Sequence, residues 1–292
     1  MRYDRPTWTG VWAALAAAAL LAGPLPATAR TPPPVTAAGN ATTEADASAV
    51  DAAAGAGASA VGAAAGAGAA GLGDREVWSA RQVNDDVVEV GVYTPGDGVT
   101  PQELYRELDR QGVRGLRRPA AARAGQCRLG TAYALEDGRC PPIRWAWAGY
   151  PDPQVHFRDR TPRAWPVKEA VRAWNRAPGV DSHWTDRGCP RERRHCVEVR
   201  SGDFGSGWAG NTTYRMTMGR NFVDGSVLVR LNDRYATSTA DRRSTACHEL
   251  GHALGVGHNT STASCMYPVD NALDRTQPHR GDVDLLRRVI YP

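Results

Sequence analysis

The alternation of apolar and polar residues predicts a series of short strands after residue 75. A two-residue period is typical of a strand with one buried face, and such runs occur at residues 87–93, 144–147, 154–157, 196–200, 210–218 and 227–231. Helical spacing takes over at residues 165–177, which begin near a proline and end before Pro178-Gly179. It returns at residues 282–291, where one helical face carries Val283, Leu286, Val289 and Ile290.

Residues 75–126 are predicted to form a small segment of their own. The strand at residues 87–93 is followed by a capping box made by Thr100 and Glu103, with Pro101 at the first helical position. A helix should run from there to about residue 110. Because the arginine-rich residues 114–123 are suited to processing, we interpret the segment as a strand-helix prodomain, with an integral N-terminal extension as the alternative.

The N-terminus has the pattern of a secretory signal. Arg2 and Arg5 precede an apolar run at residues 11–21, and Ala27-Thr28-Ala29 offers a small-residue cleavage site. The run is too short, and too soon interrupted, to be a membrane span. We therefore expect residues 1–29 to be a signal peptide, and the mature protein to be secreted with no membrane attachment.

Residues 30–74 differ in composition from the rest of the chain. They are rich in Ala, Gly and Pro and lack large apolar side chains, so burial cannot offset the entropy of ordering them. The segment is predicted to be a low-complexity linker or pro-region. An alanine-rich helix is the alternative, which the interspersed glycines oppose.

Residues 248–258 contain the strongest candidates for metal binding and catalysis. His248 and His252 are four residues apart and share a helical face, so both can bind one zinc ion. Glu249 is their neighbour and can reach a water molecule on the ion. Gly255 is suited to ending the helix, and the turn can bring His258 back as a third ligand. Three histidines with an open fourth position favour a catalytic zinc site over a structural one.

This motif resembles the extended zinc signature of the metzincin metallopeptidases. Met266 follows the third histidine within Ser264-Cys265-Met266-Tyr267-Pro268, and it is similar to the methionine of the turn beneath the metzincin zinc. The Met-Tyr-Pro ending resembles the matrixin branch in particular. By that resemblance Met266 forms the floor of the site without binding metal.

The resemblance implies an α+β fold for residues 127–292, the length of a metzincin catalytic domain. It implies a twisted, mostly parallel sheet with an antiparallel edge strand, a zinc-binding helix, a Met-turn and a C-terminal helix. Residues 210–218 would be the edge strand lining the cleft, where an extended polypeptide could add as a further strand. A covered edge is the alternative. Residues 268–278 would form the outer wall of the specificity pocket.

The chain departs from the matrixin pattern in two places. Asn259 follows the third histidine, where matrixins usually have serine. The chain also lacks the Pro-Arg-Cys-Gly type of cysteine switch by which many matrixin propeptides block their zinc. The motif therefore leaves the mechanism of latency open.

Six cysteines in an exported chain predict three disulfides, although sequence alone allows fifteen pairings. Proximity favours Cys127–Cys140, Cys189–Cys196 and Cys247–Cys265. The last pair would join the zinc helix to the methionine turn. Cys247 as a zinc ligand is the weaker alternative, because its side chain points about 100° around the helix from His248.

Composition indicates the kind of organism that the chain comes from, and charge and motifs limit the classes of partner that it could bind. Lys168 is the only lysine, and abundant Ala, Gly, Pro and Arg resemble the codon bias of a high-GC Gram-positive bacterium, such as an actinomycete. The net charge of +4 comes without a nucleic-acid motif, so we expect no nucleic-acid partner, and we expect a monomer. Four histidines outside the motif are predicted to be surface or core residues: His156, His183, His195 and His279. Three acidic residues could help to bind a structural Ca²⁺ ion: Asp203, Asp224 and Asp233.

The sequence thus predicts a secreted zinc-dependent endopeptidase. Zn²⁺ would activate a water molecule, with Glu249 as its general base. Two other hypotheses stay open at this point. One is a non-catalytic zinc-bearing module that binds a surface, and the other is a zinc hydrolase of a non-protein amide such as a peptidoglycan crosslink.

Overall fold

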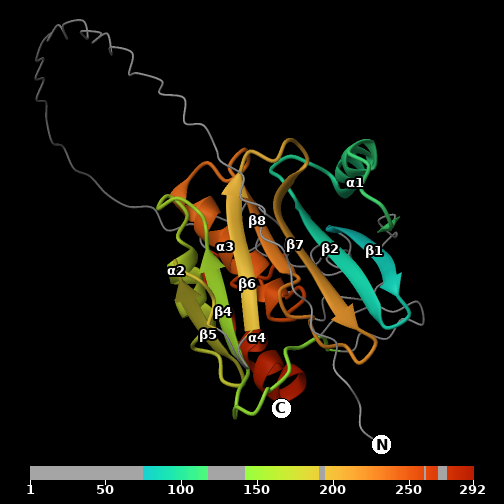
Figure 1. Cartoon of the computed structure of the whole chain (residues 1–292). Coiled ribbons are helices and arrows are strands. Elements are labelled where there is room, and N and C mark those ends of the chain that lie inside the picture. Colours follow the sequence, from blue (N-terminus) through green and yellow to red (C-terminus); the bar gives the residue numbers. More distant parts are fainter. Residues whose placement is uncertain (1–74, 118–141, 191–194, 260, 269–274) are drawn as a thin grey trace, which may run out of the picture. The chain divides into compact units, whose positions relative to one another are not determined.

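The computed structural model describes residues 75–117, 142–190, 195–259, 261–268 and 275–292 (Figure 1). Several sequence predictions lie outside these residues. They are the signal peptide at residues 1–29, the linker at residues 30–74, the Cys127–Cys140 pair and the greater part of the arginine-rich stretch.

A single mixed sheet of eight strands organises the described residues, in the order β3-β1-β2-β7-β8-β6-β4-β5. Its parallel half is built from β4, β5, β6 and β8, whose bounds are Gln154–Asp159, Asp181–Thr185, His195–Gly202 and Val227–Asn232. These strands carry most of their apolar side chains at alternate positions, as the sequence predicts for β4, β6 and β8. The short polar strand β5 was missed because it has no apolar period.

The other half of the sheet is antiparallel. It consists of β7, β2, β1 and β3, with bounds Trp208–Thr217, Val87–Pro95, Val77–Asn84 and Leu116–Arg117. Within residues 127–292, the four parallel strands and the antiparallel β7 agree with the expected arrangement. In the full chain β7 is not an edge strand, so the alternative of a covered edge holds. β7 is antiparallel to β8, but β2 pairs along its other side. Val90 and Val92 explain this, because pairing with β7 buries both side chains in the main core.

Helices cover both faces of the sheet (Figure 1). Helix α2, Val167–Trp174, packs on β4 and β5, and helix α3, Thr239–Ala253, packs on α2, β7 and β8. Helix α1, Pro101–Arg110, starts at the predicted Thr100–Glu103 capping box. It forms a second apolar cluster with side chains of β1, β2 and β7: Val77, Tyr93, Leu104, Leu108 and Trp208. No described helix is both long and apolar enough to cross a bilayer.

The face of each side chain on β1 and β2 follows from strand alternation. Tyr93 and its partner Val77 pack in the α1 cluster, whereas Val92 belongs to the main core. Neighbouring residues of a strand point to opposite faces. Glu76 and Thr94, one residue away from this pair, therefore lie on the face that carries α3.

Two further sequence predictions need correction. Residues 144–147 form no strand, and only Arg144 makes an isolated bridge, with Asn221. The backbone N–H of Trp145 donates instead to the Tyr291 hydroxyl. The C-terminal helix is α4, Arg280–Leu285, followed by the π-helical turn η1, Leu286–Ile290. The wider π turn rotates Val289 away from the apolar face, and its side chain is 41% exposed.

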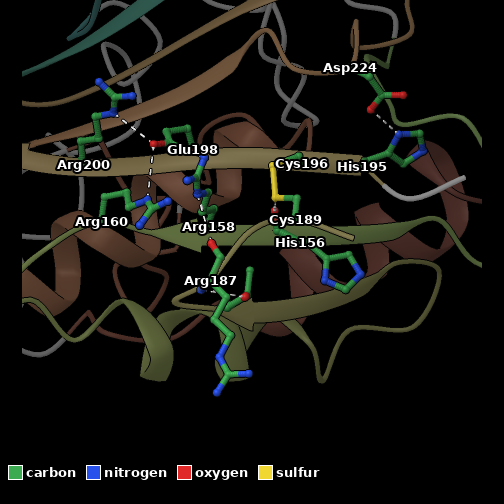
Figure 2. Close-up of a disulfide and its surroundings, with 11 residues drawn as sticks. His156, Arg158, Arg160, Arg187, Cys189, His195, Cys196, Glu198, Arg200 and Asp224 are labelled. Carbon is green, nitrogen blue, oxygen red and sulfur yellow. Dashed lines mark hydrogen bonds and ion pairs between the residues drawn. A yellow bond between two sulfur atoms is a disulfide. The ribbon is translucent and has the colours of Figure 1, made fainter. Parts of the chain in front are cut away.

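One predicted disulfide braces the parallel half of the sheet. Cys189, in the loop after β5, is bonded to Cys196 on β6 (Figure 2). Nearby on β6, the carboxylate of Glu198 lies within ion-pair distance of Arg158 and Arg200. This region therefore has a local structural role, held by a covalent bond and by surface ion pairs.

Candidate active site

Helix α3 places His248 and His252 on one buried face, one turn apart. Each ring has its Nδ1–H turned to a backbone carbonyl: His248 donates to Cys265 O at 2.8 Å, and His252 donates to Val256 O at 2.9 Å. Such a bond fixes the tautomer and leaves Nε2 with a free lone pair. The two Nε2 atoms face each other at 3.0 Å.

The turn after α3 brings the third histidine to the same point. Gly255 has φ 89°, and a Cβ there would lie 2.0 Å from the carbonyl oxygen of Ile143. Glycine is thus required both for the left-handed turn and for the close contact. The His258 ring centre then lies 5.3 Å from that of His248 and 5.5 Å from that of His252. The predicted trio is brought together in space.

A fourth side chain completes this group, and sequence reasoning did not identify it. Glu76, immediately before β1, points its Oε1 atom at all three rings, 3.1 Å from His248 Nε2, 3.0 Å from His252 Nε2 and 2.8 Å from His258 Nε2. The four ligand atoms lie within 4.8 Å of one another. Among the described residues this is the only such group of three or more His, Cys, Asp or Glu side chains.

The charges of the group are strongly coupled. Burial raises the pKa of Glu76, but the nearby imidazoles outweigh burial and hold that pKa well below its usual range. Burial lowers the pKa of His248, and the Glu76 carboxylate overcomes this effect and raises it to about 9. For His258, burial dominates and lowers the pKa. These directions show a pocket in which Glu76 is an anion and attracts positive charge.

The donor set fits a metal cation. Nitrogen lone pairs that face each other at 3.0 Å repel unless a proton or a metal ion lies between them. His258 Nε2 is buried and has no hydrogen-bond partner in the described part of the chain, despite its nearness to Glu76. Imidazole nitrogen with carboxylate oxygen is a donor set that Zn²⁺ prefers.

A model of the matrixin family matches residues 40–289, which is more than half of the chain. The chain belongs to the matrixin family. Among curated proteins, none matches it. Matrixins are zinc metalloendopeptidases, so the enzyme class and the metal expected from the sequence are confirmed, and the Glu76–histidine group is its metal site candidate.

The matrixin motif glutamate, Glu249, is fully buried beside the histidines. Thr94 Oγ1 donates to its Oε1 at 2.7 Å, and Thr212 Oγ1 donates to its Oε2 at 2.6 Å. A Cβ on Gly210 would lie 2.3 Å from Oε1, so only glycine leaves room for the carboxylate there. Burial raises the pKa of Glu249, which makes it a stronger base than an exposed carboxylate.

Met266 is fully buried and packs against α3. A Cβ on Gly251 would meet its sulfur atom at 2.3 Å, which shows how closely the helix rests on this turn. The turn is fixed from below, because Ser264 Oγ accepts from Met266 N and donates to Asp282 Oδ2. The structure thus packs the predicted floor residue against the helix that carries His248 and His252.

The structure joins Cys247 on α3 to Cys265 beside Met266 through a disulfide, with an S–S distance of 2.05 Å. This is the pairing that proximity favours. The alternative of Cys247 as a zinc ligand is wrong in this structure, since an oxidised sulfur has no thiolate to offer. The carbonyl of Cys265 is also the acceptor that orients His248.

Loss of this disulfide is expected to weaken both the fold and the metal site. Replacing Cys247 and Cys265 by alanine should lower the free energy of unfolding by about 3 kcal/mol, as the loop closure of an 18-residue separation implies. Urea titration and zinc retention against a chelator measure the two effects. Replacing Cys189 and Cys196 is the matched control, because it should lower stability without altering zinc retention. Equal zinc retention in both double variants would contradict the bracing role.

The remaining histidines and acids predicted as minor candidates have other partners. His195 uses both ring nitrogens, with Asp224 and the Ala146 carbonyl (Figure 2). The others have local contacts, as follows: His183 bonds to Gln154 and stacks on His156, His279 caps α4, Asp203 pairs with Arg234, and Asp233 accepts from Trp165. No group of three or more such ligands forms around them among the described residues.

A small recess adjoins Glu249, where a specificity pocket would be expected. Its lining includes His248, Tyr267 and Pro268, and its volume is about 10 Å³. This is about the space of one water molecule. The greater part of the expected outer wall, residues 269–274, lies outside the described residues.

Proposed function

We propose that His248, His252 and His258 hold the catalytic zinc ion of this matrixin, and that Glu249 is its general base. The convergence of the three buried Nε2 atoms beside a buried carboxylate carries the proposal. When bound, Zn²⁺ supplies Lewis acidity, which polarises a peptide carbonyl and lowers the pKa of a water molecule to about 7.

Glu249 would move the proton. Its carboxylate accepts a proton from water and then donates it to the amine that leaves when the peptide C–N bond breaks. Thr94 and Thr212 hold the two oxygens in one orientation. Met266 and the Cys247–Cys265 disulfide would keep the helix that carries these groups in place.

We further propose that the substrate is an extended polypeptide and that the enzyme acts outside the cell. The backbone of β7 passes Glu249 at Gly210 and Thr212, so a peptide paired with β7 would run past the metal ligands. Disulfides form in oxidising compartments, which agrees with export. Family membership favours neither a surface-binding module nor a hydrolase of a non-protein amide.

Metal removal should abolish cleavage reversibly. The full chain is first nicked with immobilised trypsin, which acts at arginine-rich segments, and the beads are removed before assay on casein. Cleavage should fall below a tenth on adding 1,10-phenanthroline, and it should return when Zn²⁺ is restored. The Glu249→Gln chain, treated in the same way, controls for residual trypsin. Cleavage that is insensitive to the chelator would overturn the proposed function.

A further inference from the structure

We infer that Glu76 is a fourth zinc ligand, and that the β1–β2 hairpin holds it in place so that the full chain carries a closed, latent site. This inference rests on the zinc site of the proposed function. It adds a metal ligand from outside the motif and assigns residues 75–117 as an internal inhibitor. We call residues 75–117 the inhibitory segment.

The size of the four-atom group supports a shared metal. In a tetrahedral zinc shell with bonds of about 2.0–2.1 Å, two ligand atoms are about 3.3 Å apart. Glu76 Oε1 lies 2.8–3.1 Å from the three Nε2 atoms, and the Nε2 atoms of His248 and His252 lie 3.0 Å apart. These four of the six distances are close to those of one tetrahedral shell, and all four atoms lie within 4.8 Å of one another, so Oε1 can take the fourth corner.

The burial of Glu76 also points to a cation. Its side chain is 1% exposed, and its ion-pair partners among the described residues are the three histidine rings. Oε2 has no hydrogen-bond partner in the described part of the chain. A buried carboxylate with an unsatisfied oxygen is costly unless a positive charge compensates it. A zinc ion held by three neutral imidazoles provides that charge.

Occupation of the fourth corner by Glu76 would exclude catalysis. A catalytic zinc needs that position for water or substrate, whereas four protein ligands are typical of a closed site. Thr94 Oγ1 lies 3.2 Å from Glu76 Oε1 and 2.7 Å from Glu249 Oε1. Glu76 therefore lies where the water that Glu249 should deprotonate would be.

The same segment covers the strand that a substrate would use. β2 pairs antiparallel with β7 from Val87↔Thr217 to Thr94↔Gly210, and a register shift follows at Pro95. The β7 backbone is thus paired on both sides, by β2 and β8.

A glutamate as fourth ligand would take the place of the cysteine that many matrixin propeptides use to block their zinc. The first cysteine of the chain is Cys127, so no thiolate precedes the catalytic segment. A glutamate next to a paired strand can do the same work, because β1 and β2 fix its position relative to β7. Cleavage within residues 114–123 would cut the link between the inhibitory segment and the metal-binding part.

The test uses the full, uncleaved chain with Co²⁺ in place of Zn²⁺, because the visible spectrum of Co²⁺ reports its ligands. Acetohydroxamate, a small metal-binding probe, is titrated into three proteins. The wild type should bind it weakly, and Glu76→Gln should bind it at least about tenfold more tightly, since an amide is a poor ligand. Glu89→Gln is the matched control on the same hairpin. Its carboxylate pairs with Arg81 and Arg215, away from the histidines, so it should behave as the wild type.

The outcomes separate this inference from the proposed function. Equal probe binding and equal cobalt spectra in wild type and Glu76→Gln would overturn the fourth ligand, even if the nicked chain cleaves casein. Failure of the wild type to bind Co²⁺ would overturn the histidine site itself. A second variant, Glu76→Ala, is checked for folding by a circular dichroism melt. If it is folded, it must also bind acetohydroxamate more tightly than the wild type. If Glu89→Gln increased acetohydroxamate binding as much as Glu76→Gln does, the increase would be due to a loosened hairpin. That result would contradict a specific role of Glu76.

Discussion

Glu249→Gln in the nicked enzyme should lower kcat by about 10²–10⁴-fold, the range that a general base contributes. The change keeps the size of the side chain and removes only its ability to accept a proton. Of Thr94 and Thr212, one can still donate to the amide oxygen, and the hydroxyl oxygen of the other can accept from the amide NH2 group, so the packing around the site should persist. Initial rates on a quenched-fluorescence peptide measure the effect, and zinc content per chain shows whether the metal stays.

Glu169→Gln is the matched control, because Glu169 is an exposed carboxylate on α2. It should change kcat less than twofold. A Glu249→Gln enzyme with one zinc per chain and the full rate would refute the role of Glu249 as base. A variant that loses zinc would instead show that the carboxylate acts mainly in metal binding.

His252→Ala should remove the metal and, with it, all measurable cleavage. His252 is fully buried, and its Nε2 lies within 3.0 Å of both Glu76 Oε1 and His248 Nε2. Loss of one of three neutral ligands from a preformed site should reduce zinc content from one per chain to below a tenth. Zinc is measured by mass spectrometry of the metal after gel filtration.

His183→Ala provides the matched control for a histidine outside the motif. Its ring stacks on His156 and bonds to Gln154 at the far edge of the sheet, on β5. Zinc content and rate should stay at the wild-type level. Full zinc occupancy in His252→Ala, or loss of zinc in His183→Ala alone, would place the metal elsewhere.

The core of the site could be predicted from sequence because its residues lie within one short stretch. A helical period predicts the common face of His248 and Glu249 on α3, and a turn residue, Gly255, predicts the end of that helix. Met266 follows soon after in the sequence, so it too is a local feature. Physical proximity along the chain also identified the Cys247–Cys265 disulfide. These predictions depend on neighbours within about twenty residues.

Glu76 could not be found in this way. It precedes His248 by 172 residues, and a lone glutamate before a weakly apolar strand carries no motif. Its position follows from the pairing of β1 with β2 and of β2 with β7, which sequence does not give. The same long-range pairing covers the edge of β7, because the residues of β2 predict a strand but not its partner.

The most direct test of the zinc site is anomalous X-ray diffraction at the zinc edge from crystals of the full chain. We expect one strong peak at bonding distance, about 2.0–2.1 Å, from the Nε2 atoms of His248, His252 and His258. In the uncleaved chain a carboxylate oxygen of Glu76 should lie at the same distance. The absence of a peak among the three histidines, in zinc-loaded crystals from a preparation that cleaves casein after nicking, would contradict the proposed zinc site.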